Sequence, residues 1–164
     1  MMKPNDLEAA RAVALRFLGY SARSRSEMQK RLERDEFAPE IIDAVLADLE
    51  ARNWVNDAKF AHDWVEDRAE RKKYGRGRLA AELRRKGVDK EMVTAALDTV
   101  EDADELARAM AAAASRWKLS ADETDREAIQ AEKRRIGAFL QRRGFGWSII
   151  TQVLAEHAAN QEAL

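Results

Sequence analysis

The segment "MQKRLERDEFAPEIIDAVL", residues 28–46, decides the fold, because its apolar pattern recurs along the chain. Spacings of 4, 5, 5 and 4 positions separate its apolar residues Met28, Leu32, Phe37, Ile42 and Leu46. The segments "LAAELRRKGVDKEMVTAAL", residues 79–97, and "IGAFLQRRGFGWSIITQVL", residues 136–154, carry apolar residues at the same five places. Three copies of one pattern, offset by 51 and then 57 residues, indicate an internal repeat.

Each copy predicts a helix, a turn and a second helix, since apolar residues four positions apart lie on one helix face. Gly87 and Gly144 fall at the turn, where glycine takes the left-handed conformation that commonly ends a helix. Glu36 stands at this place in the first copy, so we expect a different turn there. Pro39 suits the first turn of the helix that follows.

A further helical stripe precedes each copy, which makes the repeat unit three helices long. The three stripes are Ala10, Val13, Ala14, Phe17 and Leu18; Phe60, Ala61, Trp64, Val65 and Ala69; and Leu106, Ala107, Met110, Ala111 and Ala114. Capping-box signatures at Ser24 with Glu27, at Asp102 with Glu105, and at Ser120 with Glu123 predict helix starts.

The third copy carries an insertion of eleven residues near 119–129. That length is close to three helical turns, so we expect the middle helix to be extended at its start, from Ser120; a loop is the alternative. We predict an all-α fold of three tandem three-helix repeats that form an elongated, curved array. The predicted domains are residues 1–55, 56–101 and 102–164, the last holding the insertion.

The composition excludes several classes of protein. The 164 residues are 46% hydrophobic and 36% charged, so the chain can bury a core, and the absence of Cys excludes disulfides. The N-terminal "MMKPNDLEAARA" lacks the apolar run of a signal peptide. No apolar run approaches the ~18 residues that span a bilayer. We therefore expect a soluble, cytoplasmic protein.

Motifs for catalysis or cofactor binding are missing. His62 and His157 are far apart and lack the companions of a metal site. Gly75-Arg76-Gly77 is not followed by the Gly-Lys-Ser/Thr of a phosphate-binding loop, so we expect it to be a flexible connection between helices. We expect no enzyme: no catalytic residue, no cofactor and no metal.

The four Trp invite a comparison between burial and base stacking. Trp64 falls on an apolar stripe and is expected in the core. Trp54, Trp117 and Trp147 lie at helix ends, where we expect them to seal contacts between helices or repeats; stacking on nucleobases is the alternative.

Positive charge is segregated, although the formal net charge is only −1. Between Arg68 and Lys86 there are nine Lys or Arg against two Glu, whereas acidic residues gather at 98–105. A basic line along the array would suit a polyanion or a long acidic surface. The residues predicted to bind a partner or DNA are Arg25, Arg34, Arg68, Arg71, Lys72, Lys73, Arg76, Arg78, Arg84, Arg85, Lys86, Lys133, Arg134, Arg135, Arg142 and Arg143.

The repeat places basic residues at equivalent positions. Arg25, Arg76 and Lys133 are superposed, as are Arg34, Arg85 and Arg142. Cations near the C-terminus of a helix also complement its dipole, at about 0.3–1 kcal/mol each, which accounts for the second set without any ligand.

The run from Ser24 to Val88 resembles the bacterial regulatory protein RecX family. The shared pattern comprises Ser24-Arg25-Ser26-Glu27, Leu32, Asp57, Phe60-Ala61, Trp64-Val65, Arg68, Gly75, Leu79, Leu83 and Gly87-Val88. The third repeat follows the family more weakly, to residue 156. Met28 replaces the usual Leu and Trp64 the common Tyr, and both keep the stripe apolar.

The resemblance implies a modulator of the RecA recombinase, built of tandem three-helix units. Such proteins bind RecA and its filament on single-stranded DNA. They limit filament growth, ATP hydrolysis, strand exchange and the coprotease activity of the SOS response. Docking in the filament groove and capping of the growing end are both open. The expected partners are RecA and its filament, with weak direct DNA binding, no membrane contact and a monomeric chain.

Two other classes remain as alternatives. Three-helix units resemble small DNA-binding folds in outline, so an autonomous nucleic-acid-binding module is the first. A helical scaffold for a different protein is the second.

Overall fold

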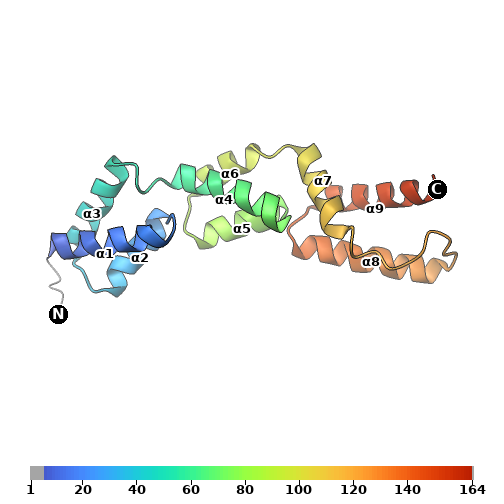
Figure 1. Ribbon diagram of the computed structural model, residues 1–164, viewed down its shortest axis with the longest axis horizontal. Helices are drawn as coiled ribbons and strands as arrows, with labels where there is room; N and C mark the ends of the chain where they lie inside the picture. Colours follow the sequence, from blue (N-terminus) through green and yellow to red (C-terminus); the bar gives the residue numbers. More distant parts are fainter. Residues whose placement is uncertain (1–5, 164) are drawn as a thin grey trace. The chain divides into compact units, whose positions relative to one another are not determined.

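A computed structural model describes residues 6–163, and within them the regular secondary structure is all α-helix, as predicted (Figure 1). Residues 1–5 and 164 lie outside the described part, and with them the start of the segment that we compared with a signal peptide. The helices are α1 (Leu7–Tyr20), α2 (Arg25–Arg34), α3 (Pro39–Ala51), α4 (Asp57–Lys72), α5 (Arg76–Arg85), α6 (Lys90–Asp98), α7 (Asp102–Ala113), α8 (Arg126–Arg142) and α9 (Trp147–Glu162). Across that same stretch, no helix is both long enough and apolar enough to cross a bilayer.

The helices form two compact units. One unit holds the chain up to Asp63 together with Glu82–Ala96, and the other holds Trp64–Ala81 together with the chain from Leu97 onward. Helices α4, α5 and α6 therefore contribute to both units. The curvature expected of the array stays a prediction, as do the three domain boundaries.

The core of the first unit gathers where α1, α2 and α3 pack against one another. All five positions of the first apolar pattern are buried, from Met28 to Leu46. Ala10, Val13 and Ala14 of α1 join them, while Phe17 and Leu18 are partly buried. The predicted stripes of these three helices are confirmed.

The core of the second unit gathers where α7, α8 and α9 pack together. Ile136, Leu140, Phe145 and Ile150 are buried as the repeat predicts, with Leu154 partly buried. The stripe predicted for α7 was wrong in part: its buried alanines are Ala109 and Ala113, whereas the predicted Ala107, Ala111 and Ala114 are exposed. A run of alanines has no hydrophobic period, so its sequence cannot show which face is buried.

The turn between the second and third helix of each repeat has one geometry. In all three turns one residue is left-handed, with φ of 62° at Glu36, 77° at Gly87 and 90° at Gly144. The next residue donates its N–H to the carbonyl five positions back, at 3.2, 3.1 and 3.1 Å for Phe37, Val88 and Phe145.

The expectation of a different turn at Glu36 was therefore wrong. Glu36 is exposed, so its side chain has room. A Cβ at Gly87 would instead overlap the side chain of Ser26, and one at Gly144 would overlap the backbone of Arg78. Glycine is needed at those two turns because another segment presses on them, in addition to the left-handed φ.

The insertion in the third repeat is part helix and part loop. Helix α8 begins at Arg126, with Asp125 as its N-cap, and not at Ser120. Ser120 lies in a loop before the helix, so its capping box was wrongly predicted; Asp102 was also wrong, because the N-cap of α7 is Glu101. The capping box of Ser24 and Glu27 is confirmed at the start of α2.

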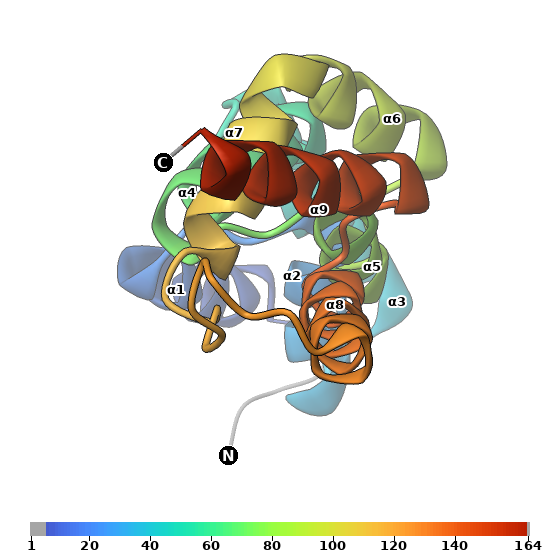
Figure 2. The same cartoon turned by 90° about the vertical axis from the view of Figure 1, so that its right-hand side faces the viewer.

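The inserted loop is fastened to α8 through Glu132, which the repeat aligns with Ser24 and Gly75. The carboxylate of Glu132 accepts the N–H groups of Lys118 at 2.7 Å and Leu119 at 3.0 Å. Figure 2 shows the loop next to the start of α8. Burial alone would raise the pKa of Glu132, but these bonds and the guanidinium of Arg135 at 2.7 Å outweigh it and hold the pKa below its usual value.

Candidate partner-binding surface

The start of α2 is joined to the turn between α5 and α6, within the first unit. The hydroxyl of Ser24 donates to the carbonyl of Lys86 at 2.5 Å, and the same side chain accepts the N–H of Glu27 at 3.1 Å. The ammonium of Lys86 then pairs with Glu27 at 2.7 Å. Ser24 is fully buried, so the cap of α2 also fixes the turn that Gly87 makes.

The start of α5 is joined to the turn between α8 and α9 in the same way, within the second unit. Gly75 donates its N–H to the carbonyl of Arg143 at 2.8 Å, and Gly77 donates to that of Gly144 at 3.0 Å. A Cβ on Gly75 would lie 2.5 Å from the carbonyl carbon of Gly144. The expectation of a flexible connection was wrong, because these glycines let two backbones meet in a hydrogen-bonded junction.

A carboxylate caps the middle helix at both junctions. The N–H of Arg25 donates to Asp57 at 2.8 Å, and the N–H of Arg76 donates to Glu105 at 3.0 Å. Burial raises the pKa of Asp57, although the bond from Arg25 opposes that shift. Each carboxylate lies near the start of the following α4 or α7, so acid and helix N-terminus stabilise one another.

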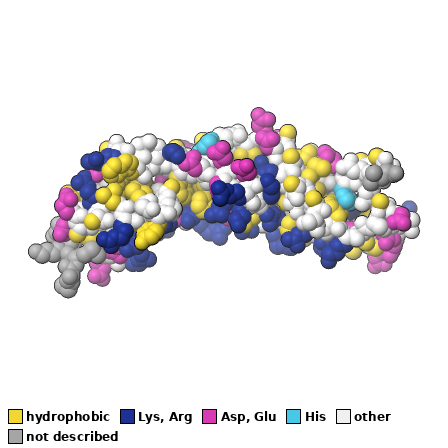
Figure 3. Space-filling view, in the orientation of Figure 1, with side chains coloured by type: hydrophobic (Ala, Val, Ile, Leu, Met, Phe, Trp, Pro, Cys, Tyr) yellow, Lys and Arg dark blue, Asp and Glu magenta, His cyan; other side chains and the backbone are white. Residues whose placement is uncertain are grey.

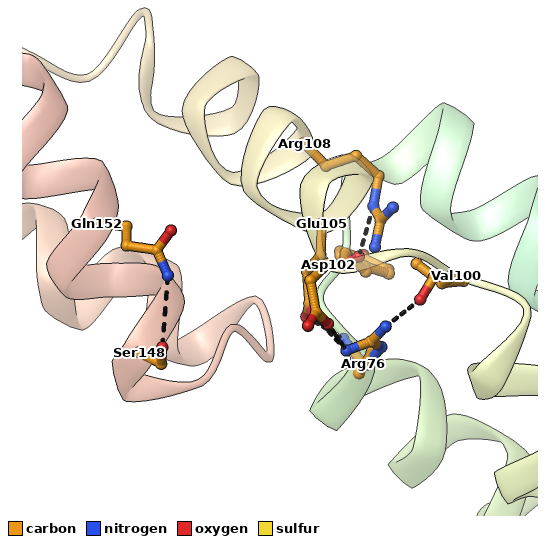
Figure 4. A network of polar contacts seen from close by, with 8 residues as sticks. Arg76, Val100, Asp102, Glu105, Arg108, Ser148 and Gln152 are labelled. Atoms are coloured by element: carbon orange, nitrogen blue, oxygen red, sulfur yellow. Dashed lines mark hydrogen bonds and ion pairs between the residues drawn. The ribbon is translucent and has the colours of Figure 1, made fainter.

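The side chains of the two arginines also point into these junctions. The guanidinium of Arg25 pairs with Glu50 at 2.6 Å. Figure 4 shows the guanidinium of Arg76 between Asp102, at 2.6 Å, and the carbonyl of Val100, with Glu105 at 3.3 Å. Two residues of the predicted basic line therefore hold the fold together.

Arginines stack around Tyr74 in the middle of the basic segment. The guanidinium carbon of Arg78 lies 4.0 Å from the ring centroid of Tyr74, and that of Arg143 lies 5.1 Å from it. Arg143 also donates to the carbonyl of Lys72, and Arg108 donates to that of Tyr74 at 3.4 Å. Burial lowers the pKa of Arg108. Stacking fixes the planes of these guanidinium groups.

Several other predicted residues are held by local partners. Arg68 stacks on Trp64 at 4.4 Å, and Arg71 pairs with Asp67 at 2.8 Å. Arg135 pairs with Glu132. Two further predicted residues are described by conformation and burial. The backbone of Lys73 is left-handed, with φ of 53°, and Lys133 is partly buried.

A remaining group of cations is exposed. Arg34, Arg85 and Arg142 are the last residues of α2, α5 and α8, as the repeat predicts, and all three are exposed. Figure 3 shows Lys and Arg side chains over α5 and α8. We define the exposed cation set as those residues predicted to bind a partner that are exposed and for which the described contacts give no ion pair or other side-chain contact: Arg34, Lys72, Arg84, Arg134 and Arg142.

The acidic partners of the junctions were not predicted from the sequence. Asp57 and Glu105 each cap a helix of the preceding repeat, yet neither was predicted to do so. The separation of Glu105 from Arg76 is 29 positions, which no helical period links. The signal that could have found them is an acid near the start of the first helix in both the second and third repeats.

The tryptophans divide into two groups. Trp117 stacks on His157 with ring centroids 3.5 Å apart, beside a cavity of about 310 Å³ in the third repeat, so its sealing role is confirmed. Trp64 is only partly buried. Trp54 and Trp147 are 50% and 74% exposed, so the expectation that they seal contacts was wrong.

Comparison with known proteins places these features in a family. Residues 10–49, 56–97 and 103–154 match the first, second and third three-helix domains of RecX. A protein of Corynebacterium efficiens named "Regulatory protein RecX" is 43% identical over 136 residues, which are 80% of this chain and 63% of that protein. The Mycolicibacterium vanbaalenii protein of the same name is 35% identical, over 94% of this chain and 85% of its own length.

A solved structure shares the fold. The crystal structure of RecX from Lactobacillus salivarius aligns with a TM-score of 0.79 over 92% of this chain and 95% of that one, at 19% sequence identity. The predicted fold of three tandem three-helix repeats is thereby confirmed.

Proposed function

The chain belongs to the RecX family of regulatory proteins, and on that premise we propose that it is a negative regulator of the RecA recombinase. It binds RecA and the RecA filament on single-stranded DNA and limits filament growth. ATP hydrolysis, strand exchange and the coprotease activity of the SOS response fall with it. The match of all three domains to the family is the observation that carries this proposal.

We assign the contact with the partner to the exposed cation set, which has Arg34 and Arg84 in the first unit and Lys72, Arg134 and Arg142 in the second. Arg34, Lys72 and Arg142 are the last residues of α2, α4 and α8. Arg84 lies one residue before the end of α5, Arg134 lies within α8, and all five residues are exposed. The RecA filament offers DNA phosphates and acidic side chains, both of which attract such cations. Arg25 and Arg76 are assigned instead to the junctions, because their carboxylate partners hold them there.

Binding to a preassembled RecA filament on labelled single-stranded DNA tests this proposal. A variant with alanine at all five positions of the exposed cation set should bind at least tenfold more weakly at low salt, and the difference should shrink as salt is raised. The matched control removes five other exposed cations: Arg16, Arg52, Lys59, Lys90 and Arg126.

The control separates a specific surface from net charge. Both variants lose the same charge, so the proposal requires that the control keeps most of its affinity. Equal affinity of both variants for the filament would overturn the assigned surface. Failure of the unaltered chain to bind the filament would overturn the function itself.

A further inference from the structure

Trp147 is exposed to a degree that folding alone does not explain. Its side chain is 74% exposed at the first position of α9. The other repeats carry Pro39 and Lys90 at this position. An indole is among the costliest side chains to leave in water, and aromatic side chains dominate binding energies at interfaces.

The surroundings of Trp147 in the sequence are free of acid. From residue 133 to residue 155 the chain has five cations, Lys133, Arg134, Arg135, Arg142 and Arg143, and no Asp or Glu. The first turn of α9 carries no acidic residue, and its N-cap, Gly146, offers no side-chain acceptor. Such a stretch favours a negatively charged partner.

The turn that carries Trp147 is held in place. Gly144, three residues earlier, accepts the N–H of Gly77, and Arg143 accepts that of Gly75. The guanidinium of Arg143 donates to the carbonyl of Lys72 and lies over Tyr74. Trp147 therefore starts from a fixed backbone, which lowers the entropy lost when a partner covers its ring.

We propose that Trp147 stacks on a base of single-stranded nucleic acid, while the exposed Arg142, five residues earlier in the chain, meets an adjoining phosphate. Exposed aromatic rings combined with cations are typical of sites that bind single strands without sequence preference. An acidic protein surface could form ion pairs with the cations, but its carboxylates would offer no aromatic ring on which the indole of Trp147 could stack. This role goes beyond the proposed regulation of RecA, because it needs no recombinase.

The test compares two oligonucleotides of equal length and charge, one of thymidines and one of abasic sites. The full chain is titrated into each, and fluorescence anisotropy of a label on the DNA gives the affinity. Trp147→Ala should weaken binding to the thymidine strand at least fivefold and leave binding to the abasic strand unchanged. Trp147→Phe should keep part of the difference, since phenylalanine still stacks.

Trp54→Ala is the matched control. Trp54 is also exposed, but its neighbour Arg52 is already paired with Asp48 at 3.0 Å, and the acids Glu50 and Asp57 lie nearby in the sequence. Its loss should therefore change neither affinity. The unfolding midpoint of Trp147→Ala should equal that of the unaltered chain, because the side chain has little burial to lose.

Two results would overturn the stacking role: an unchanged affinity of Trp147→Ala for thymidines, and an equal loss of affinity on both strands. An unchanged affinity accompanied by a loss of RecA inhibition would place Trp147 against the recombinase. If the unaltered chain does not restrain RecA but the oligonucleotide results hold, the proposed regulation fails while the stacking role stands.

Discussion

Replacing Gly75 with alanine tests the junction between α5 and the turn at Gly144. The new Cβ would lie 2.5 Å from both the carbonyl carbon and the carbonyl oxygen of Gly144 and 2.6 Å from the N of Phe145. These are backbone atoms, so the turn would have to move by about 1 Å to restore ordinary contact distances of about 3.5 Å.

The cost follows from the two ways in which the protein can respond. If the turn moves, the bonds from Gly75 and Gly77 are lost, at about 0.5–1.5 kcal/mol each. If it stays, the overlap costs about 1–3 kcal/mol. Either response gives a loss of about 1–3 kcal/mol in the free energy of unfolding, or about 2–12 °C in Tm.

Urea and thermal unfolding, followed by circular dichroism at 222 nm, measure this loss. Gly146→Ala is the control, because Gly146 also directly precedes a helix and a Cβ there meets nothing within 4 Å. It should change stability by less than about 1 kcal/mol. A Gly75→Ala protein as stable as the control would refute the close-packed junction.

Three further predictions follow from the same contacts. Ser24→Ala should lower the free energy of unfolding by about 1–3 kcal/mol, because it removes both the cap of α2 and the hydrogen bond to the carbonyl of Lys86. Urea unfolding measures this loss. A loss no larger than that caused by Ser148→Ala, at an exposed serine, would contradict the prediction. Glu36→Gly should change the free energy of unfolding by less than about 1 kcal/mol. Gly87→Ala should lower it by more, because only the new Cβ at position 87 would overlap the side chain of Ser26. Equal effects of the two variants in thermal unfolding would contradict this prediction. Folding lowers the pKa of Glu132, so the contribution of this carboxylate to stability is present above its pKa in the unfolded chain and is lost as pH falls through its pKa in the folded chain. Glu132→Gln should therefore make the free energy of unfolding, measured by urea titration at each pH, fall less steeply on the acid side. An unaltered slope would contradict this role of Glu132.

The periodic part of the fold could be predicted because large aliphatic residues mark it. Met28, Leu79 and Ile136 occupy one position of the repeat, and all three are fully buried. The turn glycines Gly87 and Gly144 could also be predicted, because they lie at the same position of the apolar repeat in the second and third copies. Burial of a repeated stripe needs only local spacing, which a single sequence shows.

Contacts between repeats could not be predicted in this way. Position 87 needs glycine because Ser26 of the preceding repeat presses on it. The sequence does not show this contact, so Glu36 at the equivalent position wrongly indicated a different turn. The basic position of Arg76 was predicted, but its use was not, because its partner Glu105 belongs to another helix. Charge density in a sequence shows where cations gather and does not show which of them are already paired.

The proposed regulation of RecA is best tested by measuring ATP hydrolysis by RecA on single-stranded DNA while this chain is titrated in. Hydrolysis should fall as the chain is added. A fall at ratios far below one chain per RecA would favour capping of filament ends, and a fall near equal ratios would favour coating of the groove. Hydrolysis that stays constant up to an excess of folded chain would contradict the proposed regulation of RecA.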